Sequence, residues 1–356
     1  MKLPYIKPLD GLRTIAVVMV IVSHFFSIDS FPDGFKWLHR ATQFGSSGVS
    51  LFFVLSGFVI TRILLQSVQN EHYFKSFYMR RVLRIFPLYY FALFFYYALP
   101  YLASLVNLHI GIQYPIGLNV VYFATYLQNI AMTFNWNDAG PVHFWSLSVE
   151  EHFYLVWPAV VFFVYPSSPK KLTYLILILI ATTFILRLFM LKHGYNIDYF
   201  TPVRVDQLLL GSFLAILERK GFLIRQFRKY YLLALFTGIA FLIFCIFQND
   251  FYVDLYKHNA LGLTFLGLIA LTIVYAERSW LSSFLNLSFM QYIGKISYGM
   301  YVWHPLVLVT INKFYPTHSV LLNFVLVLAV TTAVSALSFK FLEMPFLKLK
   351  KHFAYK

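Results

Sequence analysis

The stretch Arg13-Thr-Ile-Ala-Val-Val-Met-Val-Ile-Val-Ser-His24-Phe-Phe-Ser-Ile28 places a histidine inside an apolar run that is long enough to cross a membrane as a helix. An ionisable side chain is costly in such a helix, so His24 and Arg13 are candidate functional residues. The 11 positions that separate them complete three helical turns to within about 20° and rise by about 16 Å. The two side chains therefore share one helix face, with Arg13 at its end and His24 deep in the apolar run.

The composition is that of an integral membrane protein. The chain is 60% hydrophobic and 12% charged, with a mean hydropathy of +0.68, whereas a soluble domain carries about 25% charged residues. Apolar runs of spanning length recur along all 356 residues. Because barrel strands would alternate in polarity, we predict an all-α fold, a single polytopic membrane helix bundle over residues 1–356.

Basic residues between the apolar segments predict the topology. The candidate segments are roughly 12–28, 47–65, 86–105, 117–134, 151–166, 172–191, 204–217, 230–247, 260–277, 296–314 and 319–342. Lys2, Lys7 and Arg13 precede the first segment, so the positive-inside rule places the N-terminus in the cytoplasm.

Segment 117–134 is the weakest candidate span because it contains Asn119, Gln128 and Asn129. If it is re-entrant or interfacial, 22 of the 29 Lys and Arg residues are cytoplasmic. We therefore predict about ten transmembrane helices with both termini in the cytoplasm. The net charge of +15 then reflects cytoplasmic loops beside anionic membrane lipid and requires no nucleic acid.

A polar motif, His143-Phe-Trp-Ser-Leu-Ser-Val-Glu150-Glu151, leads into the fourth predicted span at its outer end. Two carboxylates at a helix start are favoured by the helix dipole, and a plain helix terminus with an interfacial Trp145 is one interpretation. The other is catalytic. His24 lies toward the same side, so Glu150 or Glu151 can orient its imidazole and raise its basicity, as a general base requires.

Two arginines mark the cytoplasmic start of the third predicted span. Arg81 and Arg84 are three residues apart and are therefore neighbours on one helical face. Paired guanidinium groups suit a phosphate, although the spacing alone favours ordinary positive-inside flanking.

The ninth predicted span carries Ser297, Tyr301 and His304 on one helix face, followed by Pro305. The proline frees the carbonyl of Tyr301, which is tolerable only if something polar lines the site. His304 suits either a satisfied core histidine or a catalytic role.

Three further charged residues lie near the outer ends of spans five and six, namely Arg187, Arg204 and Asp206. A structural ion-pair cluster is the first expectation there, and acceptor binding is the alternative. Glu343 closes the last span, either as the partner of an arginine or as part of a cofactor site. We find no metal-ligand spacing in the sequence.

Together these segments resemble the acyltransferase-3 family of integral-membrane acyltransferases. The matching elements are Leu9-Asp-Gly-Leu-Arg13 with His24, Gly48-Val-Ser-Leu-Phe-Phe-Val-Leu-Ser-Gly57, Arg81-x-x-Arg84, Trp145-Ser-Leu-Ser-Val-Glu-Glu151, Arg204-x-Asp206 followed by Gly211, Ser297-Tyr-Gly-Met-Tyr-Val-Trp-His304-Pro, and Glu343-x-Pro345.

The resemblance implies an O-acetyltransferase of the bacterial cytoplasmic membrane. Such an enzyme would move an acetyl group from cytoplasmic acetyl-CoA to a hydroxyl of an extracytoplasmic glycan or lipid-linked sugar, such as lipopolysaccharide O-antigen or exopolysaccharide. The resemblance implies that His24 is the essential histidine and that Arg81 and Arg84 contact the phosphates of the donor. With it, we predict catalysis by His24, Arg13, Glu150 and Glu151, donor binding by Arg81, Arg84 and Glu343, and substrate binding by His304, Tyr301, Ser297, Arg204, Asp206 and Trp145. Because the chain ends at Lys356, we expect the stand-alone type without a fused outer domain.

Two chemistries fit these residues. His24 can deprotonate the acceptor for direct attack on the thioester, or an acyl-enzyme can form on His24 or Ser297. A different class of function is a secondary transporter that moves a small polar solute past His24, Arg187 and Asp206, although the paired broken helices typical of transporters are not visible.

Overall fold

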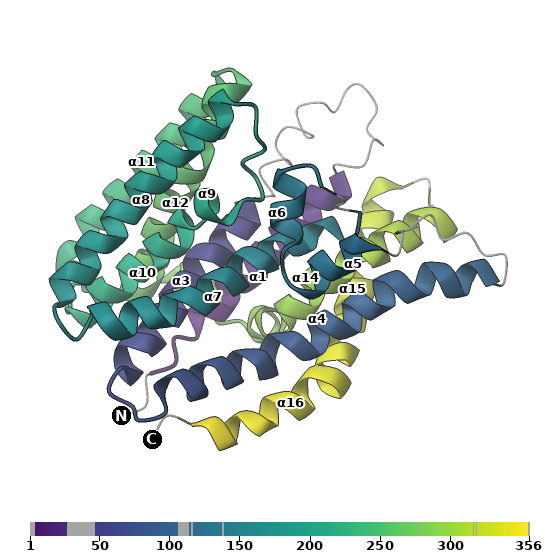
Figure 1. The fold of residues 1–356 in the computed structure, drawn as a ribbon, viewed down its shortest axis with the longest axis horizontal. Helices are drawn as coiled ribbons and strands as arrows, with labels where there is room; N and C mark the ends of the chain where they lie inside the picture. The colour runs from purple at the N-terminus through teal and green to yellow at the C-terminus, as the bar shows by residue number, and fades with distance from the viewer. Residues whose placement is uncertain are drawn as a thin grey trace.

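The computed structural model describes residues 4–26, 47–105, 114, 117–136, 139–277, 279–315, 317 and 319–354, which form a bundle of helices without any β-strand (Figure 1). The long helices are α1 (Pro8–Phe26), α3 (Ser47–Ser67), α4 (Tyr73–Leu105), α7 (Trp145–Val164), α8 (Pro169–Lys192), α10 (Asp206–Arg219), α11 (Arg228–Ile246), α12 (Asp250–Val274), α14 (Ser288–Phe314) and α15 (Val320–Ser338). The predicted all-α helix bundle is confirmed.

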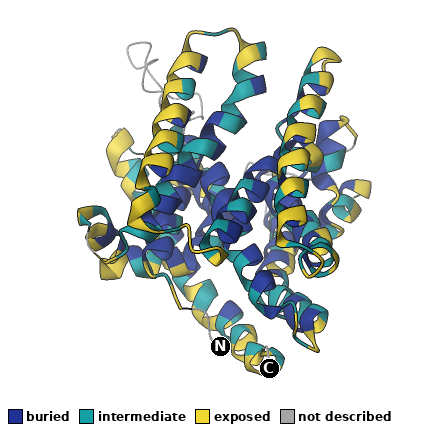
Figure 2. Ribbon diagram, turned by 90° about the vertical axis from the view of Figure 1, so that its left-hand side faces the viewer, coloured by how far each residue is buried: buried dark blue, intermediate teal, exposed yellow. Residues whose placement is uncertain are grey.

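Eight helices in the described ranges are long and apolar enough to cross a membrane, namely α1, α3, α4, α7, α8, α11, α12 and α15. The two other predicted spans are occupied by α14, with 27 residues, and α10, with 14 residues. The outer helices α8 and α11 expose apolar side chains such as Ile178, Ile185 and Leu233, and buried residues gather toward the middle of the bundle (Figure 2). An apolar exterior of this kind suits lipid rather than water.

Segment 117–134 does not form a spanning helix. It folds as two short helices, α5 (Leu118–Ala124) and α6 (Gln128–Thr133), separated by Tyr126 with φ of 59°. Helices of 7 and 6 residues rise only about 10 Å each, against about 30 Å of hydrocarbon. The buried side chains of Asn119, Gln128 and Asn129 donate hydrogen bonds to Ala139 O, Phe144 O and Tyr199 O. These polar residues therefore hold a re-entrant or interfacial segment in place, as expected.

Close helix approach explains two glycines of the predicted motifs. A Cβ on Gly57 of α3 would collide with the carbonyl of Leu208 in α10, and a Cβ on Gly211 of α10 would collide with the carbonyl of Val54 in α3. The two backbones thus meet directly, which is a common use of small residues between membrane helices. This contact and those of α1 with α3 and α14 form the centre of the bundle.

The helix α4 differs from its predicted counterpart because it begins at Tyr73 and continues through Pro87 and Pro100 to Leu105. Its 33 residues extend for about 50 Å, which exceeds the hydrocarbon thickness by more than half. Arg81 and Arg84 therefore lie inside α4 rather than at its start. The two chain ends lie at the same end of the bundle (Figure 1); that this end is cytoplasmic remains a prediction.

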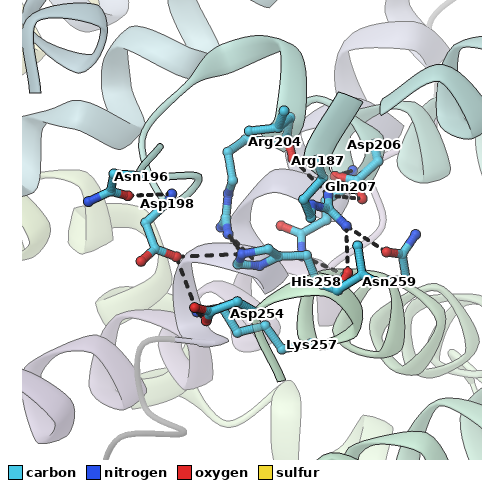
Figure 3. Close-up of polar contacts among 12 residues, drawn as sticks. Arg187, Asn196, Asp198, Arg204, Asp206, Gln207, Asp254, Lys257, His258 and Asn259 are labelled. Carbon is cyan, nitrogen blue, oxygen red and sulfur yellow. Dashed lines mark hydrogen bonds and ion pairs between the residues drawn. The ribbon is translucent and has the colours of Figure 1, made fainter. Parts of the chain in front are cut away.

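A fully buried ion pair connects three helices (Figure 3). Arg187 of α8 donates to the Asp206 carboxylate of α10 over 2.7 Å and to the Asn259 side-chain carbonyl of α12 over 2.6 Å. The same guanidinium donates to the carbonyl of Val203 over 2.7 Å. Both charges are inaccessible to solvent, so the structure gives Arg187 and Asp206 the structural role rather than a place on a solute pathway.

We predict that Asp206→Ala strongly destabilises the protein, because Arg187 would keep a buried charge without its partner. The free energy of unfolding should fall by about 3–5 kcal/mol. The measurement is the midpoint temperature of thermal unfolding in detergent, which should be lower than that of the wild type. Asp254→Ala is the matched control, since it removes a partly exposed pair with Lys257 and should cost about 0–1 kcal/mol. The double variant Arg187→Met, Asp206→Leu should unfold at a higher temperature than Asp206→Ala, because it leaves no unpaired buried charge. A midpoint of Asp206→Ala equal to that of the wild type would contradict the structural role.

Candidate functional site

A cavity of about 120 Å³ lies between α1, α3, α4, α7 and α14. Three guanidinium groups line it, from Arg13 of α1 and from Arg81 and Arg84 of α4, together with the carboxylates of Glu150 and Glu151 from α7. Its other polar lining residues are Ser56, Ser146, Tyr154, Ser297, Tyr298 and Tyr301. Five predicted catalytic or donor-binding residues thus meet at one cavity, although they come from three helices.

Arg13 is held by its own helix. Its guanidinium pairs with Asp10, three residues earlier on α1, and Asp10 is buried and also accepts a hydrogen bond from Tyr5. Partial burial and this bond raise the pKa of the Tyr5 phenol to about 12, so Tyr5 remains a donor near neutral pH. Because Asp10 offsets the charge of Arg13, this arginine is largely a fixed part of the cavity wall.

Arg81 and Arg84 are less completely paired. The guanidinium carbon of Arg81 lies 5.7 Å from the ring centres of both Phe77 and Tyr154, and its Nε has no hydrogen-bond partner within the described residues. Arg84 is within electrostatic range of Arg13, Arg81 and Glu343. None of the ion pairs formed among the described residues includes Arg81 or Arg84. Their charges are therefore available to an anion.

The two glutamates are not at a helix start, which corrects the expectation from the sequence. A 3₁₀ turn, η3 (Val142–Phe144), precedes α7, and the first turn of α7 contains no acidic residue. Glu150 instead lies in the second turn, where it is within interaction range of the hydroxyl groups of Ser56 and Tyr154, which are hydrogen-bonded to each other. One carboxylate oxygen of Glu151 is buried without a protein partner among the described residues. The helix dipole therefore contributes little to either carboxylate, since its effect is confined to the first turn.

His24 contacts a second histidine instead of a glutamate. Its Nδ1 lies 2.7 Å from Nε2 of His304, and the two rings are stacked with centres 4.9 Å apart. His304 is buried, and its own Nδ1 lies 2.8 Å from the carbonyl of Tyr301. The proposed orientation of His24 by Glu150 or Glu151 is therefore replaced by His304, because packing of α1 against α14 brings the two imidazoles together.

One turn of α14 connects the histidines to the cavity. Tyr301 lines the cavity, while its carbonyl accepts from His304 and its hydroxyl donates to the carbonyl of His143. Ser297, one turn earlier, also lines the cavity, and its hydroxyl donates to Gly294 O over 2.9 Å. Neither His24 nor His304 is among the described residues that line the cavity. The histidine pair therefore adjoins the cavity through Tyr301.

Glu343 lies in a single π-helical turn, η5 (Phe339–Glu343), directly after α15. Its carboxylate is buried, one oxygen lacks a partner among the described residues, and the charge that acts on it most strongly is that of Arg84. Glu343 forms no ion pair with an arginine among the described residues and is not among the described residues that line the cavity; its role as the partner of an arginine or as part of a cofactor site stays a prediction.

The substrate-binding candidates Arg204, Asp206 and Trp145 belong to a separate cluster. Asp206 is committed to Arg187. The Arg204 guanidinium contacts the imidazole of His258 and lies 5.2 Å from the ring centre of Trp145. These residues are not among the described lining of the cavity, and the ion pair leaves a transporter pathway through Arg187 and Asp206 without support.

At the edge of this cluster, Asp198 pairs with Lys257 over 3.2 Å and approaches His258 (Figure 3). Burial acts to raise the pKa of Asp198, but the hydrogen bond with His258 and the positive charges of Lys257 and Arg204 outweigh it and lower the pKa below its usual range. Asp198 thus remains ionised and completes a charged network rather than an open binding site.

Two contributors, Asp10 and His143, stand in motifs of the sequence but were assigned no role there. The contact of Asp10 with Arg13 could have been predicted, because the two residues are three positions apart on one helix. The contact of His143 with His304, whose ring centres are 5.5 Å apart, could not be predicted, because it joins segments that are distant in the sequence. No group of three or more His, Cys, Asp or Glu within the described ranges is arranged to hold a metal ion.

Comparison with known proteins agrees with the motifs. The model of an acyltransferase domain family matches residues 6–340. Peptidoglycan O-acetyltransferase OatA of Listeria monocytogenes is 28% identical, over 97% of this chain and 56% of its own length. Putative peptidoglycan O-acetyltransferase YrhL of Bacillus subtilis is 28% identical over 96% of this chain and 55% of its own length. O-acetyltransferase OatA of Staphylococcus aureus is 26% identical over 97% of this chain and 57% of its own length.

The chain spans about half the length of the curated relatives it matches. No solved structure matches it significantly. The family match nevertheless covers nearly the whole chain and includes every cavity-lining arginine and glutamate. This integral membrane protein therefore belongs to the acyltransferase-3 family.

Proposed function

We propose that this protein transfers an acetyl group from cytoplasmic acetyl-CoA to a hydroxyl of a glycan on the outer side of the bacterial cytoplasmic membrane. The observation that carries the proposal is a cavity with three arginines, joined through Tyr301 to a pair of hydrogen-bonded histidines. Phosphate-binding groups and a proton acceptor are the two components that such a transfer requires.

The relatives direct the choice of acceptor. Two of them are named as peptidoglycan O-acetyltransferases, one of these putatively, so peptidoglycan is the first acceptor to test. Lipopolysaccharide O-antigen and exopolysaccharide, which the motifs suggested, present the same hydroxyl chemistry and are the second choice.

Arg81 and Arg84 would hold phosphate groups of the donor. They lie on one face of α4, they line the cavity together, and no carboxylate forms an ion pair with either among the described residues. Guanidinium groups bind phosphate oxygens through paired, charge-assisted hydrogen bonds. Glu343, within electrostatic range of Arg84, would orient that guanidinium toward the cavity.

His24 would act as the base, with His304 as its positioning residue. A carbonyl only accepts hydrogen bonds, so the contact of His304 Nδ1 with Tyr301 O places the proton of a neutral His304 on Nδ1. Its Nε2 then accepts, and His24 Nδ1 must donate to it. This leaves the lone pair of His24 on Nε2, which is the arrangement of a general base held by a second group.

Direct transfer is the chemistry that we propose for this arrangement. His24 takes the proton from the acceptor hydroxyl as its oxygen attacks the thioester carbonyl, and the imidazolium returns the proton to the departing thiolate. Ser297 is less suited to carry an acyl group, because its hydroxyl donates to Gly294 O rather than to an imidazole among the described residues.

We predict that His24→Ala reduces acetyl transfer by at least about 100-fold, since removal of a general base typically costs 10²–10⁴-fold. The rate is measured as acceptor-dependent release of CoA thiol in proteoliposomes, with mass analysis of the glycan product. His72→Ala is the matched control, because His72 is exposed between α3 and α4. Transfer by His24→Ala within a few-fold of the wild-type rate would refute the assigned role.

We predict that His304→Leu lowers kcat about 100-fold with little change in KM for acetyl-CoA, because His24 loses its hydrogen-bond acceptor. His304→Gln retains an acceptor of similar reach and should lose only about tenfold. Equal losses in the two variants, or a change confined to KM, would show that His304 does not position His24.

A further inference from the structure

The chain does not end with its last long helix. After α15 it passes through η5 into α16 (Met344–Leu349) and the 3₁₀ turn η6 (Lys350–Phe353), and α16 runs beside α4 (Figure 1). Each of these elements packs against α4. The Arg80 guanidinium donates to the carbonyl of Lys350 over 3.3 Å, so this C-terminal segment is fixed next to the arginines of α4.

Lys350 differs from the neighbouring lysines. Lys348 and Lys351 are exposed, whereas Lys350 is half-buried. The positive charges of Arg84, Arg81 and Arg80 all act on its ammonium group, and the carboxylate of Glu343 acts in the opposite sense. No ion pair among the described residues includes Lys350.

The positive charges of Lys350, Arg81 and Arg84 would be stabilised by an anion bound between them. Like charges close together repel, and the repulsion is stronger where water is partly excluded. An exposed lysine could swing into solvent, but the backbone of Lys350 is held by Arg80 and its side chain is partly enclosed. A bound phosphate would satisfy the ammonium and the adjacent guanidinium groups together.

We propose that Lys350 is a further donor-binding residue, through which the C-terminal segment closes the Arg81–Arg84 end of the cavity and binds a phosphate of the acyl donor. The inference rests on the proposed function, because that function supplies a donor with phosphate groups. The ammonium serves as a compact point charge beside two planar guanidinium forks. A phosphate in a membrane-lipid headgroup has the same chemistry, so the test must separate the two sources.

The test uses the full-length protein in nanodiscs of zwitterionic lipid, with acetyl-CoA and acetyl-pantetheine as donors. Acetyl-pantetheine retains the thioester and lacks the nucleotide phosphates. Lys350→Gln should raise KM for acetyl-CoA about tenfold, as expected for the loss of one charge-assisted hydrogen bond, and should leave the rate with acetyl-pantetheine unchanged. Lys350→Arg should restore most of the affinity, and the exposed controls Lys348→Gln and Lys351→Gln should match the wild type.

Three results would overturn the inference. An unchanged KM of Lys350→Gln for acetyl-CoA would show that Lys350 does not bind the donor. An equal loss with acetyl-pantetheine would show a structural role, and an effect that appears only after anionic lipid is added would assign the site to lipid headgroups. Wild-type protein that neither binds nor consumes acetyl-CoA would instead refute the proposed function itself, whatever the variant does.

Discussion

The cost of burying charge among apolar helices is the constraint on which this structure depends. An ionisable group at that depth must be paired or it must serve a ligand, and the bundle contains both cases. Arg187 has a carboxylate, an amide and a backbone carbonyl as partners, whereas Arg81 and Arg84 form no ion pair within the described residues. The presence of a carboxylate ion-pair partner on Arg187 distinguishes the structural cluster from the proposed donor site.

The same constraint connects a helix defect to the proposed chemistry. Pro305 cannot donate a backbone hydrogen bond, so the carbonyl of Tyr301 needs another donor. His304 supplies it, and this commits the second nitrogen of His304 to accept from His24. The proline in α14 thereby determines which nitrogen of His24, on α1, carries the proton.

Much of the fold was predictable because it follows from local properties of the chain. The long apolar runs and the polar interruption at 117–134 correspond to the expected helices and the expected break. The errors concern positions along a helix. Glu150 appeared to begin a helix, but η3 and the first turn of α7 precede it, and α4 starts 13 residues before the predicted span, at Tyr73.

The sequence by itself determined which segments form long apolar helices and which ionisable residues lie within them, because hydrophobicity and helical period are local. It also placed Arg13 and His24 on one face of α1. Only the tertiary structure decided which of these residues meet. His24 and His304 are 280 positions apart, and their contact depends on how α1 packs against α14. Helix–helix packing brings such groups together, and no spacing within a single helix encodes it.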